Sequence, residues 1–210
     1  MAGLVSLGLA LLLSFSFRIV EKLSTLIRNG DNKQFFQLAA IYIWGACAIA
    51  AALVVSDQYV FRVPTVDTTA FALAAAAILI NAVIPQHSGY HPSGKFNIIN
   101  FVVTYPIVEE IIYRGLLLPI LDRSFHYTVV EIYDLPVTLS IVITALLFAV
   151  AHLQYYKLNR TSIKYMVFAF TGGIIFGVIT NATHSILIPV LLHVEYNLLA
   201  VYYSNKMKAE

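Results

Sequence analysis

The feature that most constrains how this chain folds is a group of three charges inside an apolar stretch. Glu109, Glu110 and Arg114 lie between Phe101 and Leu121, and most of the residues around them are apolar. A stretch of this length matches a membrane-spanning helix, which needs about 20 residues. Charged side chains are costly at bilayer depth, and where they occur they commonly mark function. We therefore expect these side chains to face a polar interior within a bundle of membrane helices.

The composition also indicates a membrane protein. Of the 210 residues, 60% are hydrophobic and 11% are charged, whereas soluble domains contain about 25% charged residues. The formal net charge of +2 is too small to predict a nucleic-acid partner. The single cysteine, Cys47, excludes an intramolecular disulfide and a cysteine-based metal cluster. The expected surroundings are the lipid bilayer, with no nucleic acid.

Apolar stretches long enough to cross the hydrocarbon core recur along the whole chain. They predict an all-α fold, a polytopic membrane helix bundle of about seven transmembrane helices with a polar cavity in the cytoplasmic half. The predicted helices cover Gly3–Val20, Phe36–Ser56, Thr68–Pro85, Ile98–Leu121, Leu135–Tyr155, Ile163–Asn181 and His184–Tyr203.

The distribution of basic residues predicts the orientation of the bundle. With seven crossings, only Arg62 and Arg123 fall outside the helices on one side of the membrane. Because Lys and Arg accumulate in cytoplasmic loops, the more basic side is predicted to be cytoplasmic. The N-terminus is then outside and the C-terminus in the cytoplasm, and we expect a prokaryotic plasma membrane. The basic residues on the predicted cytoplasmic side are Arg18, Lys22, Arg28, Lys33, Lys95, Lys157, Arg160, Lys164, Lys206 and Lys208.

The fourth predicted helix carries a candidate general base. Glu110 and Arg114 are four residues apart, in the favourable order for a helical ion pair. This pair either only stabilises packing or also supports a site. Glu109 points about 100° away from Glu110 around the helix, so it shares Arg114 less well. Glu109 is therefore the better candidate to accept a proton.

The fifth and seventh predicted helices carry candidate partners for this carboxylate. Phe148 and His152 share one face, and so do His193 and Asn197. A lone histidine on an apolar helix commonly only packs, but an unmatched imidazole is costly inside a membrane. Imidazole and amide groups are also donors that stabilise an oxyanion. The predicted depths allow all of these side chains to converge in the cytoplasmic half of the bundle.

Two further features concern the shape of the predicted helices. Gly173 and Gly177 form a small-residue face, which predicts that the sixth helix approaches the fourth or the seventh closely. Pro189, four residues before His193, predicts a kink in the seventh helix. Such a kink would open room for water or substrate.

Three motifs in this order resemble a known family. They are Glu-Glu-x-x-x-Arg at Glu109–Arg114, Phe-x-x-x-His at Phe148–His152 and His-x-x-x-Asn at His193–Asn197. The pattern is similar to the CPBP family of glutamic-type intramembrane endopeptidases, also called the Abi or CAAX-protease family. The resemblance covers roughly Ile98 to Ala200. It divides the chain into an N-terminal three-helix region (1–97), a CPBP-like catalytic core (98–204) and a short cytoplasmic tail (205–210).

The resemblance implies a role for each motif residue. Glu109 would activate the attacking water, and His152 would help to hold it. His193 and Asn197 would stabilise the oxyanion, while Glu110 and Arg114 would support the site. The implied substrate is a membrane-anchored protein or peptide, such as a prenylated CAAX-like tail, a peptide precursor or a C-terminal sorting signal.

Several alternatives to this mechanism remain open from the sequence. Glu109, His152 and His193 could together bind zinc, although the water mechanism needs no cofactor and also explains Asn197. A non-catalytic immunity or binding protein could keep the same residues as a pocket. A proton-relaying transporter is a further class, and the lack of visible inverted repeats disfavours it.

Overall fold

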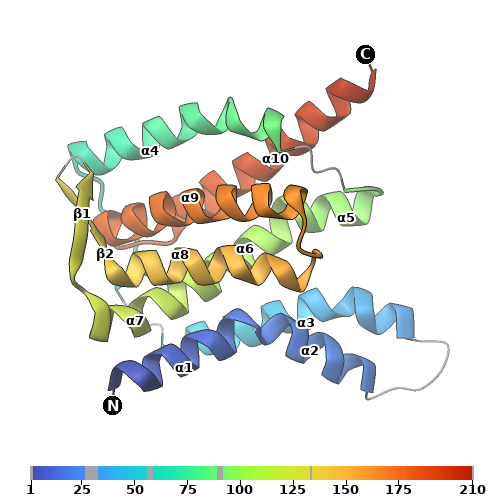
Figure 1. Cartoon of the computed structure of the whole chain (residues 1–210), viewed down its shortest axis with the longest axis horizontal. Coiled ribbons are helices and arrows are strands. Elements are labelled where there is room, and N and C mark those ends of the chain that lie inside the picture. Colours follow the sequence, from blue (N-terminus) through green and yellow to red (C-terminus); the bar gives the residue numbers. More distant parts are fainter. Residues whose placement is uncertain (1, 27–32, 56–58, 89–91, 133, 210) are drawn as a thin grey trace.

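The structure is a computed structural model that describes residues 2–26, 33–55, 59–88, 92–132 and 134–209, and it is a bundle of helices (Figure 1). The first part contains α1 (Ala2–Ser14), α2 (Ser16–Leu26), α3 (Lys33–Val54), α4 (Thr68–Asn81) and the 3-10 turn η1 (Ile84–His87). A long helical run follows, made of α5 (Lys95–Ile99), η2 (Asn100–Thr104), α6 (Tyr105–Glu110), η3 (Ile111–Leu117) and α7 (Leu118–Phe125). The remaining elements are β1 (Thr128–Ile132), β2 (Leu135–Thr138), α8 (Leu139–Ala151), the 3-10 turn η4 (His152–Gln154), α9 (Arg160–Thr183) and α10 (Leu187–Ala209).

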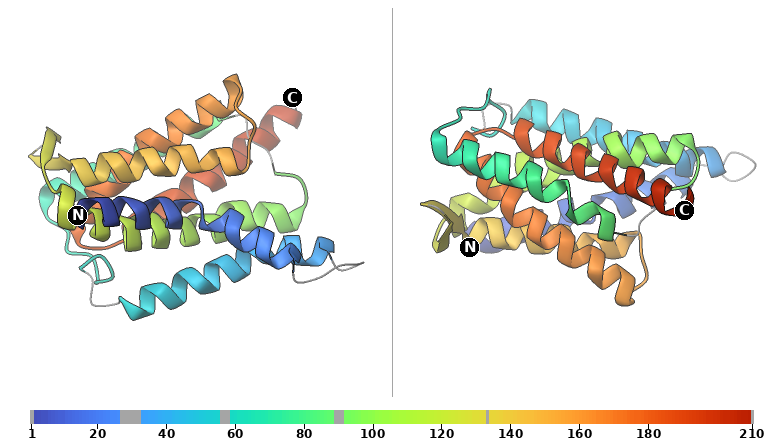
Figure 2. Two further views of the ribbon diagram at one scale, coloured as in Figure 1. Left: turned by 60° about the horizontal axis from the view of Figure 1, so that its bottom comes forward. Right: turned by 90° about the horizontal axis from the view of Figure 1, so that it is seen from above.

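The predicted helical bundle is confirmed, and helices occupy each of the seven predicted stretches. The helices α1, α2 and α3 lie along one side of the bundle, and α4 lies along the opposite side (Figure 1). The N-terminus and the β1–β2 hairpin lie at one end, and the C-terminus lies at the other (Figure 2). Lys95 and Arg160, the first residues of α5 and α9, lie at the end that also holds the C-terminus.

Two predicted helices differ in their details. The stretch Gly3–Val20 is not one helix, because α1 and α2 meet at a break near Phe15 and are bent by 47°. The stretch that was predicted to begin at Leu135 begins with a β-strand instead. β1 and β2 form an antiparallel hairpin in which Ile132 pairs with Leu135. Asp134 has a φ of 63° at this turn, a conformation that aspartate tolerates better than most residues.

Side-chain caps explain where three of the helices begin. The Asp67 carboxylate accepts the backbone N–H of Ala70 at 2.7 Å and so starts α4. Thr138 caps α8, which therefore starts only after the hairpin. Asn159 and Ser162 form a reciprocal capping box at the start of α9. Such caps satisfy backbone N–H groups that have no partner inside the helix.

Two π-helical segments precede prolines in the long run between Lys95 and Phe125. η2 ends two residues before Pro106, and η3 ends two residues before Pro119. Proline has no N–H and its ring clashes with the carbonyl four residues earlier, so an ordinary α-helical turn is strained there. The wider π turn relieves that clash, and π segments often occur at functional sites. Glu109 and Glu110 end the α-helical segment between the two π segments.

The small-residue face of α9 packs against α8, which corrects the predicted partner. A Cβ atom added at Gly173 would lie 2.9 Å from the Cβ of Ala145, and one added at Gly177 would lie 2.8 Å from Cγ2 of Ile141. The sixth predicted helix therefore approaches the fifth most closely, and Gly173 also lies near Nη2 of Arg114 on the fourth. The predicted kink at Pro189 is also wrong. α10 begins at Leu187, so Pro189 lies in the first turn, where its missing N–H costs no helical hydrogen bond.

The apolar surface of the bundle matches a membrane environment. Among the described residues, the segments Thr68–His87 and Arg160–Thr183 are long and apolar enough to cross a bilayer, and the bent α1–α2 pair is a third if it forms one span. Ala39–Val54 and Leu139–Gln154 are shorter apolar helices. Large apolar side chains are exposed on several helices, including Leu12, Leu53, Phe71 and Leu79. Contiguous exposed apolar surface of this kind needs to be covered, and lipid would cover it.

Candidate functional site

The Glu110 carboxylate is the centre of a buried polar cluster. Both Glu110 and Arg114 are 0% exposed. Oε1 of Glu110 accepts hydrogen bonds from Nη1 of Arg114 at 3.0 Å and from Nδ1 of His193 at 2.8 Å. The predicted contact between Glu110 and Arg114 is thus confirmed. The bond to His193 ties α10 to α6, and it joins two of the three motifs directly.

The Arg114 guanidinium lies between two aromatic rings. Its Cζ atom is 4.9 Å from the ring centre of Phe148 and 5.5 Å from that of Phe176. Nε and Nη2 have no hydrogen-bond partner among the described residues. Cation–π attraction to the two ring faces offsets part of this loss. Phe148, the first residue of the second motif, therefore contacts the side chain that neutralises Glu110.

Glu109 occupies a narrow crevice on the other side of the same helix. Its exposed fraction is 8%. The N-terminal helices supply part of the wall, and the residues that line the crevice with Glu109 are Ser14, Trp44, Tyr113, Phe148, Ala151, His152, Gln154 and Tyr155. Oε2 of Glu109 lies 3.8 Å from Nε2 of His193. The His193 imidazole thus has one carboxylate at each of its ring nitrogens.

The bond to Glu110 determines what His193 can donate. With the Nδ1 proton directed at the Glu110 carboxylate, the neutral ring has a lone pair on Nε2. Nε2 carries a proton only in the imidazolium form. In that state Nε2–H is a donor directed toward the side of the ring where Glu109 lies.

Asn197 is held by a backbone carbonyl of η2. Its Nδ2 donates to the backbone oxygen of Phe101 at 2.7 Å. This bond engages one N–H of the Asn197 amide, and the amide carries a second N–H that can act as a donor.

His152 lies at the end of α8, where the helix tightens into the 3-10 turn η4. Its Nδ1 is 2.9 Å from the backbone oxygen of Phe148. A histidine whose Nδ1–H donates to a carbonyl exposes an unprotonated Nε2. Such a nitrogen accepts a hydrogen bond from water. His152 borders both the Glu109 crevice and a larger cavity.

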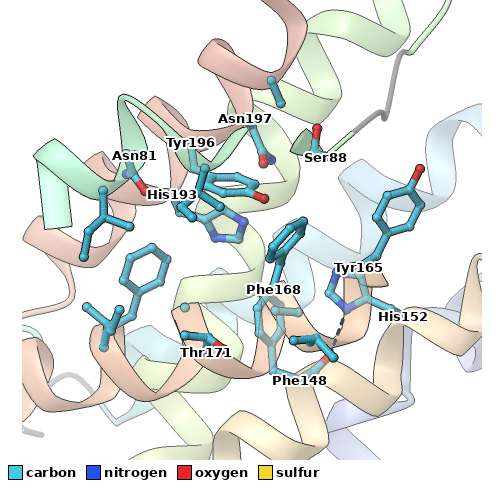
Figure 3. Close-up of a pocket in the computed structure, with 18 of the residues that line it drawn as sticks. Asn81, Ser88, Phe148, His152, Tyr165, Phe168, Thr171, His193, Tyr196 and Asn197 are labelled. Atoms are coloured by element: carbon cyan, nitrogen blue, oxygen red, sulfur yellow. Dashed lines mark hydrogen bonds between the residues drawn. The ribbon is translucent and has the colours of Figure 1, made fainter. Parts of the chain in front are cut away.

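That larger cavity has a volume of about 360 Å³ and is mostly apolar. It lies among α4, α8, α9 and α10. Figure 3 shows His193 and Asn197 reaching it from α10, and Phe148 and His152 reaching it from the end of α8. Glu109 does not line the cavity directly, and Phe148 and His152 separate the cavity from the Glu109 crevice. We call the side of this mostly apolar cavity that is formed by His152, His193 and Asn197 its polar wall.

The sequence interpretation missed polar residues that complete this region. Asn81 of α4 lines the cavity, and its Nδ2 donates to the backbone oxygen of Leu192 at 2.8 Å and to Oε2 of Glu195 at 3.0 Å. Asn81 is an isolated polar residue in an apolar stretch, and Glu195 lies between His193 and Asn197. The cost of burying such groups in a membrane was the signal that could have identified them.

The break between α1 and α2 lies against the Glu109 crevice. The backbone oxygen of Ser14 accepts a bond from Nε2 of Gln154 at 2.8 Å and one from the Tyr113 hydroxyl at 3.3 Å. Nε1 of Trp44 donates to the Ser16 hydroxyl at 2.8 Å. The N-terminal region, for which the sequence suggested no motif, therefore forms one wall of the crevice.

A zinc site would require Glu109, His152 and His193 to converge. Among the described residues, no three His, Cys, Asp or Glu side chains are grouped closely enough to hold a metal ion. The three candidate ligands are therefore not grouped as a metal site in this structure.

The close contact of α9 with α8 makes a testable prediction about Gly173. We expect Gly173→Ala to lower the free energy of unfolding by about 1–3 kcal/mol, because the new methyl group overpacks against Ala145 and comes within 3.4 Å of Nη2 of Arg114. Gly172→Ala is the matched control, since a Cβ at Gly172 meets no atom within 4 Å. Denaturant titration of the two purified variants tests this. Equal stabilities would contradict the packing described here.

Comparison with known families supports the sequence resemblance. The family model described as type II CAAX prenyl endopeptidase Rce1-like matches residues 92–199. Comparisons with curated proteins and with solved structures gave no match. The matched segment is just over half of the chain and contains every predicted site residue, from Glu109 to Asn197. The chain therefore belongs to the type II CAAX prenyl endopeptidase Rce1-like family.

Proposed function

We propose that this protein is an intramembrane endopeptidase that hydrolyses a peptide bond through a water molecule activated by Glu109. The family is one of proteases that act on membrane-associated substrates. The observation that carries the proposal is the position of His193, whose Nδ1 is 2.8 Å from Glu110 and whose Nε2 is 3.8 Å from Glu109. General-base hydrolysis requires a carboxylate that can accept a proton, an imidazole in a fixed position and space for the substrate. Glu109, His193 and the adjoining cavity match these requirements.

The proposed reaction assigns one step to each side chain. Glu109 takes a proton from water while the water oxygen attacks the carbonyl carbon of the scissile bond. Nε2–H of the His193 imidazolium and the second N–H of Asn197 stabilise the oxyanion. When the C–N bond breaks, protonated Glu109 returns the proton to the leaving amine. The unprotonated Nε2 of His152 accepts a hydrogen bond from the water.

The proposed mechanism uses no metal ion. The spacing of the candidate ligands supports this view, because no three of the described His, Cys, Asp or Glu side chains are grouped closely enough to hold a metal ion. Glu110 and Arg114 act as positioning residues, since their contact fixes the ring of His193. Activity that a chelator removes, and that added zinc restores, would contradict this part of the proposal.

We further propose that the substrate is a prenylated C-terminal tail. The family description names prenyl endopeptidases, and most of the residues around the cavity beside His193 are apolar. An apolar cavity of about 360 Å³ suits a lipid group, which is stabilised when it leaves water for apolar surroundings. In this proposal the isoprenoid chain fills the cavity, and the peptide bond next to it meets the polar wall.

The same proposal includes the orientation of the bundle in the membrane. We propose that the chain crosses the bilayer seven times, that the N-terminus is outside, and that the cavity lies in the cytoplasmic half. Tyr156 and Tyr165 line the cavity close to Lys157 and Lys164 in the sequence, and such basic residues favour the cytoplasmic side. Single cysteines near Lys157 and near Arg62, in a Cys47→Ala background, test the orientation. The cysteine near Lys157 should react with an impermeant reagent only after the cells are opened.

The function is tested by comparing protein termini in membranes that contain the wild-type protein or Glu109→Gln. Mass spectrometry should detect C-terminal fragments that appear only with the wild-type protein, and these fragments identify the substrate. If the two sets of termini match while the variant is folded and equally abundant, the peptidase proposal fails. A non-catalytic binding or immunity role would then explain the site better.

A further inference from the structure

One face of α9 forms a long wall of the cavity, and the residue near its middle has no side chain. Tyr165, Phe168, Gly172, Ile175 and Phe176 all line the cavity. Their spacing of three and four residues places them on one side of the helix. Gly172 is one turn from Phe168 in one direction and one turn from Phe176 in the other. A side chain at position 172 would therefore point to the same side as these two rings.

The space beside Gly172 is open, unlike the space beside the other glycines of α9. A Cβ atom at Gly172 would have no atom of the described residues within 4 Å, whereas the corresponding distances are 2.9 Å at Gly173 and 2.8 Å at Gly177. Close helix packing thus explains why Gly173 and Gly177 are glycines, but it does not explain Gly172. Glycine also lowers the stability of a helix when it lies in the helix interior. The absence of a side chain at Gly172 widens the cavity instead.

The open space is continuous with the polar wall of the site. The ring of Phe176 lies 5.8 Å from that of His193, centre to centre. The ring of Phe148 lies 5.9 Å from that of His193. An apolar group that extends along α9 from His193 must therefore pass Phe176 and then Gly172. Any side chain at position 172 would shorten the space available to it.

We propose that Gly172 determines the length of the apolar chain that the cavity accepts, and this inference rests on the proposed function. The two isoprenoids that modify CAAX cysteines are farnesyl and geranylgeranyl, and the second is one isoprene unit longer. With glycine at position 172, both chains have room. A larger residue should leave room for the shorter chain and exclude the end of the longer one.

The test compares two peptides of one sequence that carry either farnesyl or geranylgeranyl on the same cysteine. The ratio of kcat/KM for the two peptides is measured with purified wild-type protein, Gly172→Ala and Gly172→Leu. We expect Gly172→Leu to shift the ratio toward farnesyl by about tenfold or more, since even one methylene in a tight apolar pocket discriminates by about tenfold. Gly172→Ala should give a smaller shift in the same direction.

Gly8→Leu is the control, because it adds the same side chain at an open glycine position away from the cavity. Gly8 is exposed on α1, and a Cβ there also meets no atom within 4 Å. This variant should keep the wild-type ratio. Both Gly172 variants are expected to fold, because Ala and Leu favour a helix more than Gly does. Their melting temperatures should equal or exceed that of the wild type.

The outcomes separate this inference from the function on which it rests. Suppose that the wild type cleaves the peptides. If both Gly172 variants then keep the wild-type ratio of kcat/KM, or lose activity on both peptides equally, the proposed role of Gly172 is wrong and the proposed peptidase function stands. If the wild type cleaves neither peptide, the prenylated substrate itself is wrong, and the inference fails with it. A second measurement, the rise in melting temperature on adding geranylgeranyl-cysteine methyl ester, should be present in the wild type and absent in Gly172→Leu.

Discussion

Glu109→Gln is expected to lower kcat/KM on a cleaved peptide by about a hundredfold to ten-thousandfold, the range that general-base catalysis supplies. Glutamine has nearly the same shape as glutamate, but its amide cannot take a proton from water. The substitution also leaves the cluster around Glu110 intact, because Arg114 and His193 both bond to Oε1 of Glu110. The loss should therefore appear in kcat, with little change in stability.

Glu195→Gln is the matched control for this prediction. Glu195 also belongs to an apolar stretch, and its Oε2 accepts a bond from Nδ2 of Asn81 at 3.0 Å. The glutamine oxygen can accept the same bond, so kcat/KM should stay within about threefold of the wild type. Kinetics of both variants on one peptide, in the same lipid or detergent, test the pair. If both substitutions lower kcat/KM equally, Glu109 has no special role, and the loss is a general effect of removing a carboxylate charge from the bundle.

The sequence predicts contacts within one helix better than contacts between helices. Glu110 and Arg114 meet as predicted because a spacing of four residues fixes their geometry. The bond between His193 and Glu110 was not predicted, since apolar length gives the depth of a residue but not the rotation of its helix. The glycine face of α9 was recognised from the sequence, but the helix that packs against it was not. Small residues show that a close approach occurs, but α8 supplies Ala145 and Ile141 from outside the motif.

Tertiary contacts also explain the elements that the sequence left unpredicted. No proline or glycine lies at the break between α1 and α2. The break is stabilised by Gln154 and Trp44, which bond to Ser14 and Ser16 from distant parts of the chain. The β1–β2 hairpin had a local signal, because Thr128–Ile132 is rich in β-branched residues. The long apolar stretch after Leu135 concealed that signal.

The second large effect concerns stability. Arg114→Met is expected to lower the free energy of unfolding by about 3–5 kcal/mol, because it leaves the Glu110 carboxylate buried with His193 as its one hydrogen-bond partner among the described residues. Both members of the Glu110–Arg114 pair are 0% exposed, so water does not screen the remaining charge. Arg62→Met, the same substitution at an exposed position, should change stability by less than about 0.5 kcal/mol. Denaturant titration in mixed micelles measures both values.

The double variant Glu110→Gln, Arg114→Met distinguishes an unpaired charge from a loss of packing. Methionine keeps much of the apolar volume between Phe148 and Phe176, and glutamine at position 110 can still bond to His193. The double variant should therefore be more stable than Arg114→Met alone, because removing both members of a buried ion pair costs less than removing one. If the double variant is instead the less stable one, Glu110 is satisfied by His193 alone. The imidazolium would then be the principal partner of Glu110, and Arg114 would serve mainly to fill the space between the two rings.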